Sequence, residues 1–248
     1  MIRAEWIKLR SLRSPRWSLA VLIGLNVLFG WMIATAQARQ WTPGQAWDPV
    51  RVSLTGVLVT QIAAAVLGAL AFTTETGSGT IRASLAAAPR RGRLLAAKAL
   101  VVAVTVLVAG VLAGLLAFVV GQAALGDQGV PRASLGDPGA VRAVVGAGLY
   151  LTAAALLGMA AGVLTRSTTA AVTGVIVAAL LVPVFANLMP EALAEFVIGY
   201  WPSAAGLRVL ATVPDPLLLD PWPGFGILAG TTAALMTAAF VSFRRRDG

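Results

Sequence analysis

One long, strongly basic segment interrupts an otherwise apolar chain, from Glu75 to Lys98. Its sequence is ETGSGTIRASLAAAPRRGRLLAAK, with Glu75 as the one carboxylate. Its five cations are Arg82, Arg90, Arg91, Arg93 and Lys98. Charged side chains in such a segment can make ionic contacts in water. We therefore interpret Glu75–Lys98 as the place where this protein contacts something outside the membrane.

The residue types that several kinds of catalysis require are missing. The sequence has no Cys and no His, which excludes thiolate nucleophiles, disulfides, histidine bases and Cys or His metal sites. A nucleotide-binding P-loop needs Gly before its Lys and Ser or Thr after it. Both lysines, Lys8 and Lys98, instead lie between apolar residues. The chain is therefore not expected to be its own ATPase, nor any other enzyme.

The composition is that of a membrane protein. Hydrophobic residues make up 58% of the 248 residues, charged residues only 12%, and the mean hydropathy is +0.84, whereas a soluble domain carries about 25% charged residues. We expect a single all-α polytopic domain over residues 1–248, with six transmembrane helices. The predicted spans are about 17–36, 52–74, 94–125, 141–164, 168–189 and 224–243, with a kink at Pro183 in the fifth.

Two segments outside these spans, residues 1–16 and 190–223, are predicted to form short helices that do not cross the membrane. Residues 1–16 contain five cations and an apolar stripe that includes Trp6, which predicts an interfacial amphipathic helix, although a plain positive flank would also account for the charge. Residues 17–36 could instead belong to a cleaved signal peptide, but the apolar run exceeds the usual 7–15 residues. Residues 190–223 hold six of the thirteen prolines. Their two short apolar pieces, about 191–201 and 203–213, predict surface-lying or re-entrant external half-helices.

The distribution of charge agrees with this map. With the N-terminus inside, the cytoplasmic segments hold 14 of the 19 cations and three acids, for a net charge of +11. The outer segments hold five cations and seven acids, for a net charge of −2. The positive-inside rule therefore supports both termini in the cytoplasm. The overall charge of +9 needs no nucleic-acid partner.

Three pairs of glycines have the spacing that lets membrane helices approach closely. They are Gly110 and Gly114, Gly158 and Gly162, and Gly226 and Gly230. Contacts within one bundle are the simpler interpretation of each pair, and a dimer face is the alternative.

The basic segment also predicts local structure. Ser78 or Thr80 can cap a helix start. Ile81 and Leu85 share one apolar edge with Ala88, and Pro89 then ends the helix. Such a segment could still be no more than a charge cluster that sets topology.

Four stretches have a recognisable sequence. They are AEWIKLRSLRSPRW at 4–17, ETGSGTIRASLAAAPRRGRLLAAKAL at 75–100, YWPSAAGLRVL at 200–210 and FRRRD at 243–247. The second is the most specific. With these stretches the chain resembles, over nearly its full length, the permease subunits of type-two ABC exporters, in the bacterial group similar to drug and bacteriocin export permeases.

The resemblance implies a multi-pass permease half in the bacterial plasma membrane, working with two copies of a separate ATPase that binds ATP and Mg. The chain itself would bind no cofactor or metal. A second permease half would complete a homodimer or heterodimer in membrane lipid. Residues 75–93 would be the coupling loop, with Thr80–Ala88 as its helix. The implied coupling residues are Glu75, Gly77, Thr80, Ile81, Arg82, Leu85, Pro89, Arg90 and Arg91.

The resemblance implies export by alternating access, driven by the separate ATPase. The apolar, uncharged spans suit a hydrophobic or amphipathic substrate. A secondary carrier is disfavoured, because no predicted span has an ionisable residue in its middle. A non-transporting membrane subunit, for sensing or immunity, remains an alternative with the same topology. An intramembrane enzyme is strongly disfavoured, because the sequence has neither a histidine nor a carboxylate in the middle of a predicted span.

Overall fold

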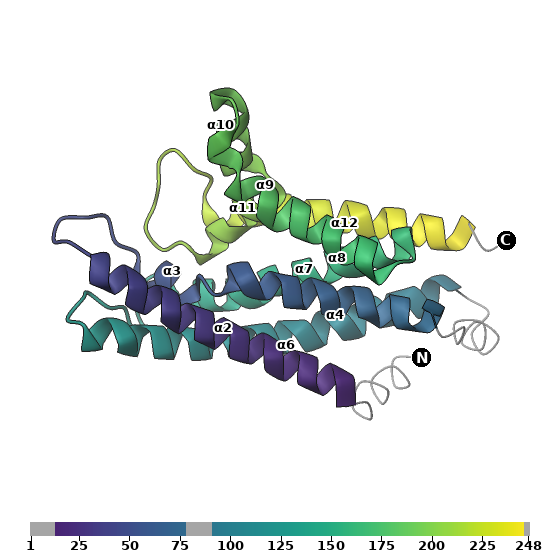
Figure 1. The fold of residues 1–248 in the computed structure, drawn as a ribbon, viewed down its shortest axis with the longest axis horizontal. Coiled ribbons are helices and arrows are strands. Elements are labelled where there is room, and N and C mark those ends of the chain that lie inside the picture. The colour runs from purple at the N-terminus through teal and green to yellow at the C-terminus, as the bar shows by residue number, and fades with distance from the viewer. Residues whose placement is uncertain (1–12, 78–90, 246–248) are drawn as a thin grey trace.

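A computed structural model describes residues 13–77 and 91–245, which form helices and loops with no strand among them (Figure 1). Five helical segments are long and apolar enough to cross a membrane. They are α2 (Arg13–Gln40), α3 with α4 (Pro49–Leu54 and Val57–Gly77), α6 (Arg91–Asp127), α7 (Ala140–Thr165) and α12 (Pro221–Arg245). The chain is thus an all-helical polytopic membrane protein, as predicted.

The predicted fifth span is shorter and less regular than the others. It consists of α8 (Thr168–Ile176), the π-helical η1 (Val177–Leu181), α9 (Val182–Val184) and the 3₁₀ turn η2 (Ala186–Leu188). The 17 residues Thr168–Val184 would rise about 26 Å, against roughly 30 Å of hydrocarbon. The π turn lies just before Pro183, which has no backbone N–H to donate. A total of six spans therefore stays a prediction.

Short helices follow in the proline-rich region. They are α10 (Glu191–Tyr200), α11 (Pro202–Gly206) and the 3₁₀ turn η3 (Leu207–Leu210). Figure 1 shows α10 projecting away from the long helices. Trp201 ties this region to η1, because its indole N–H donates to the carbonyl of Ala178 at 2.6 Å. The re-entrant, external placement of these helices stays a prediction. Residues 1–12 of the predicted interfacial helix lie outside the described residues.

Helix α7 is the centre of the bundle. It packs against α4, α6 and α12. Of its apolar stretch, 72% is buried inside the bundle, against 22% for the corresponding stretches of α2 and α12. Tyr150, Leu151 and Met159 are among its largest fully buried side chains. The apolar surfaces that α2 and α12 leave open are therefore available to lipid or to another protein.

Glycines set how closely α7 approaches its neighbours. A Cβ added to Gly68 of α4 would overlap the carbonyl of Ala155 on α7. A Cβ added to Gly158 would likewise overlap the carbonyl of Ala65 on α4. On the other side, a Cβ on Gly110 of α6 would lie 2.9 Å from the Cα of Gly148. The two helix pairs thus meet backbone to backbone.

The three glycine pairs found in the sequence differ in their surroundings. A Cβ on Gly114 would lie 3.1 Å from Ala147 Cβ, and one on Gly162 would lie 3.2 Å from Thr73 Cγ2. The first two pairs therefore pack within this bundle. In contrast, Gly226 and Gly230 have nothing described within 4 Å of an added Cβ. This third glycine pair therefore makes no close helix contact with a described residue of the monomer.

One polar pair lies in the centre of the bundle. The hydroxyl of Tyr150 on α7 donates to the Gln61 Oε1 of α4 at 2.7 Å, and Gln61 Nε2 donates to the carbonyl of Leu58 at 2.9 Å. Tyr150 and Gln61 are each 1% exposed. Because neither side chain can turn to water, the pair fixes the register of α4 against α7.

This pair leads to a first prediction. Tyr150→Phe is expected to lower the free energy of unfolding by about 1 kcal/mol, the usual scale for a hydrogen bond between membrane helices. Gln61→Leu should cost roughly 1–3 kcal/mol, because the Tyr150 hydroxyl is then buried without an acceptor. The double variant should cost less than the sum of the two, as measured by denaturant titration in mixed micelles. Strict additivity would contradict a direct interaction.

The two ends of the bundle carry different charges. Figure 1 shows the Arg13 end of α2, the Gly77 end of α4, the Arg91 end of α6 and the Arg245 end of α12 at one end. The opposite end carries the α2–α3 loop, the α6–α7 loop and the segment before α12. Asp48, Asp127, Asp137, Asp215 and Asp220 lie in or beside those loops, together with Arg39, Arg51, Arg132, Arg142 and Arg208, so that the charges at this end nearly balance. The first end has mainly cations, and we call it the basic end. Its described cations include Arg16, Arg91, Arg93, Lys98, Arg166, Arg244 and Arg245. This separation matches the two sides of the predicted topology, and which side is cytoplasmic stays a prediction.

Candidate functional site

The predicted coupling segment begins and ends at the basic end of the bundle. Glu75 and Gly77 belong to the last turn of α4, and Arg91 is the first residue of α6. The other predicted coupling residues lie outside the described residues. They are Thr80, Ile81, Arg82, Leu85, Pro89 and Arg90. The structure therefore places the attachment points of the segment, while the coupling helix itself stays a prediction.

The helical turns next to these attachment points are packed against α12. The rings of Phe72 on α4 and Phe243 on α12 meet edge to face, with centroids 5.5 Å apart. Leu95, one turn into α6, is 1% exposed and belongs to the same core cluster. A Cβ on Gly92 would lie 3.9 Å from Arg244 Cδ. A force applied between α4 and α6 would therefore act on three long helices together.

A second polar site lies at the opposite end, around Asp48. This carboxylate caps α3 by accepting the backbone N–H of Arg51 at 2.9 Å. It also accepts the hydroxyl and the N–H of Thr212, at 2.7 and 2.6 Å, and the N–H of Val213 at 3.1 Å. Both Asp48 oxygens thus accept two hydrogen bonds each. We call these contacts the Asp48 network.

Gln122 of α6 holds α3 from the other side. Its amide Nε2 donates to the carbonyl of Pro49 and to Ser53 Oγ, both at 2.8 Å. Its Oε1 accepts the N–H of Ala133 at 2.7 Å. Gln122 is 6% exposed, so these bonds are shielded from water. The short α3 is consequently fixed to both α6 and the α6–α7 loop.

Two arginines organise the segment before α12. Arg142 of α7 donates to the carbonyls of Val209 and Ala211, at 3.1 and 2.8 Å. Arg208 donates from its Nε to the carbonyl of Leu219 at 3.1 Å and is 7% exposed. Both side chains therefore satisfy backbone carbonyls that the irregular segment cannot pair within a helix.

Burial lowers the pKa of Arg208, and the positive charge of Arg51 lowers it further. The positive charges of Arg51 and Arg208 therefore repel each other. Three nearby carboxylates act in the opposite direction and raise the pKa of Arg208. They are Asp215, Asp48 and Asp220.

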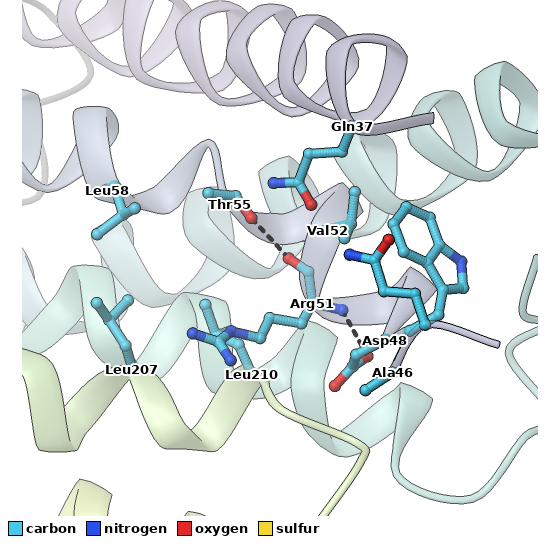
Figure 2. Close-up of a pocket in the computed structure, with 11 residues that line it drawn as sticks. Gln37, Ala46, Asp48, Arg51, Val52, Thr55, Leu58, Leu207 and Leu210 are labelled. Carbon is cyan, nitrogen blue, oxygen red and sulfur yellow. Dashed lines mark hydrogen bonds between the residues drawn. The ribbon is translucent and has the colours of Figure 1, made fainter. Parts of the chain in front are cut away.

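A cavity of about 340 Å³ opens beside the Asp48 network, between α2, α3 and η3 (Figure 2). Its polar lining consists of Gln37, Gln45, Trp47, Asp48, Arg51 and Thr55. Its apolar lining consists of Ala46, Val52, Leu58, Leu207 and Leu210. Figure 2 shows the Arg51 side chain extending away from Asp48 toward Leu210. The cavity therefore has a charged part and an aliphatic part.

None of these residues is among the site residues predicted from the sequence. The predicted spans 17–36 and 52–74 leave residues 37–51 as a loop between them, whereas α3 begins at Pro49. A signal was present, because Asp followed by Pro is a favoured pair for the N-cap and first position of a helix. Nothing comparable relates Asp48 to Thr212, since they meet only through the tertiary fold.

Comparison with known proteins gives one family. The model of the family described as ABC-2 family transporter protein matches residues 1–187 of the 248. The matched region includes every described helix from α2 to α9, and with them both attachment points of the coupling segment. No curated protein matches this sequence.

Proposed function

This chain belongs to the ABC-2 family of transporter proteins, and on that premise we propose that it is the permease subunit of an ATP-driven exporter. The family match over residues 1–187 is the observation that carries the proposal. The five long apolar helices support it, because they suit a membrane permease. The exported substrate would be hydrophobic or amphipathic, and the membrane would be the plasma membrane of a bacterium.

In this proposal the chain has six spans, with both termini in the cytoplasm, and forms half of a permease dimer. Each half would meet one copy of an ATPase subunit, which binds ATP and Mg. Closure of the two ATPase subunits would push the coupling segment. The packing of α4, α6 and α12 around Phe72 and Phe243 supports this route for the movement. Transport follows if the substrate binds the inward-open and outward-open states with different affinities.

The coupling segment provides the test. Leu85→Asp places a charge on the proposed docking edge, and Glu75→Ala removes the carboxylate at its membrane end. Both should abolish stimulation of the co-purified ATPase. A buried apolar contact at an interface is worth about 2 kcal/mol or more, which is roughly thirtyfold in affinity.

Two matched controls are available far along the chain. Leu217→Asp makes the same change at a side chain that is 92% exposed, and Glu191→Ala removes an exposed carboxylate from the start of α10. Neither should alter ATPase turnover. Normal ATPase binding and turnover in both coupling variants would refute the docking role. Stimulation without movement of any substrate in vesicles would favour a non-transporting membrane subunit.

A further inference from the structure

The cavity beside the Asp48 network has polar groups that are not equally free to bind a ligand. Asp48 lines it, yet its two oxygens already accept four hydrogen bonds. A carboxylate has about four acceptor positions, so Asp48 has no capacity left for a cationic ligand. The indole N–H of Trp47 is also in use, since it donates to the carbonyl of Pro131 at 2.9 Å. Neither group can therefore recognise a ligand directly.

Arg51 is the charged residue whose side chain can present hydrogen-bond donors to a ligand in the cavity. Its backbone N–H donates to Asp48 and its carbonyl accepts the Thr55 hydroxyl, while its exposed side chain extends along the wall (Figure 2). A guanidinium presents five N–H donors in a fork that fits phosphate or carboxylate. The amide groups of Gln37 and Gln45 lie on the same rim. An anion at this point would also relieve the repulsion between Arg51 and Arg208.

The rest of the cavity is aliphatic. Val52 and Leu210 are 7% and 3% exposed, and Ala46, Leu58 and Leu207 complete this wall. A volume of about 340 Å³ lies within the range of small-molecule pockets. A free inorganic anion would leave this wall unused, whereas an alkyl chain next to an anionic group would cover it.

We propose that this cavity binds the anionic head of an amphiphile, with its phosphate or carboxylate on Arg51 and the first part of its alkyl chain against Leu58, Leu207 and Leu210. This binding site rests on the proposed function, which places the Asp48 end of the bundle at the outer membrane surface. There an amphiphile can enter the cavity from the lipid. Binding does not depend on ATP or on the direction of transport. The ligand is either a membrane phospholipid or a separate amphiphile that shares its chemistry.

The test is a binding measurement on the full-length chain in digitonin, a neutral detergent without an alkyl chain. Calorimetry with dodecyl phosphate should show binding that is roughly tenfold weaker, or more, in Arg51→Gln, the scale of losing a hydrogen bond to a charged group. Inorganic phosphate and dodecyltrimethylammonium should each bind at least about tenfold more weakly than dodecyl phosphate. Arg39→Gln is the matched control, because Arg39 is an exposed cation near the same end that does not line the cavity.

A second variant tests the apolar wall without removing a charge. Leu58→Phe should fill the cavity and weaken dodecyl phosphate binding by a similar factor, so the proposal stays testable if Arg51→Gln does not fold. Equal affinities for wild type, Arg51→Gln and Leu58→Phe would overturn the proposal, as would equal binding of inorganic and dodecyl phosphate. Because no ATPase is present, failure here is separate from failure of the exporter proposal.

Lipid extraction from the purified protein distinguishes the two sources of ligand. Phosphatidylglycerol retained by wild type and lost from Arg51→Gln would identify a membrane lipid. Binding of dodecyl phosphate by protein that carries no retained lipid would identify a separate amphiphile. Both results support the anionic site, while retention of the same lipid by wild type and Arg51→Gln, together with equal dodecyl phosphate affinity, would refute it.

Discussion

Gly68→Ala and Gly158→Ala are each expected to prevent the chain from reaching its native bundle. An alanine Cβ at Gly68 would overlap the carbonyl of Ala155, and one at Gly158 would overlap the carbonyl of Ala65. In both cases the obstacle is backbone rather than the end of a flexible side chain. Helices α4 and α7 would therefore have to separate along their whole contact.

The expected cost is more than about 3 kcal/mol, above the usual range for one added methyl group in a packed core. It is large because α7 is the centre of the bundle and α4 is one of its main neighbours. Separating the two would also break the hydrogen bond between Tyr150 and Gln61. Thermal unfolding in detergent, and recovery of monodisperse protein, would measure the effect.

Glycines on the open face of α12 give the matched control. Gly226→Ala and Gly230→Ala add the same methyl group to an apolar helix of similar length, with nothing described within 4 Å. Both should leave the stability of the monomer unchanged or slightly improved, because alanine favours a helix over glycine by about 1 kcal/mol. If Gly68→Ala proved as harmless as Gly226→Ala, the close approach of α4 and α7 would be wrong.

The long helices could be predicted because a membrane span depends on local composition. A run of about 20 apolar residues is enough to identify one, so α6, α7 and α12 begin and end within three residues of their predicted bounds. The segment Thr168–Val184 shows the limit of this signal. It has no charged residue and is mostly apolar, but Pro183 and the π turn before it shorten the regular helix.

The polar end of the bundle could not be predicted in the same way. Asp48 and Thr212 are separated by 164 residues, and no periodicity relates them. Arg142 and Arg208 also bind backbone carbonyls, which are present at every residue and leave no mark in the sequence. The cavity depends on all of these contacts, so only the folded chain reveals it.

Asp48→Ala is expected to cost about 2–4 kcal/mol, because it removes the N-cap of α3 and the acceptor for Thr212 and Val213 together. An exposed helix cap alone contributes about 1 kcal/mol. The larger value follows from the three additional bonds to the segment before α12. The change should appear as a lower unfolding midpoint in detergent.

Hydrogen exchange gives a more specific measurement of the same variant. The amides of Thr212 and Val213 both donate to Asp48 Oδ2, so in Asp48→Ala their exchange should accelerate more than that of α7. Asp48→Asn should be intermediate, because its oxygen can still cap α3 while its NH₂ group cannot accept a hydrogen bond. Asp137→Ala is the control, since among the described residues the Asp137 carboxylate accepts hydrogen bonds only from Ser134, three positions away. Equal stability losses in Asp48→Ala and Asp137→Ala would mean that the Asp48 network does not hold the segment before α12 to α3.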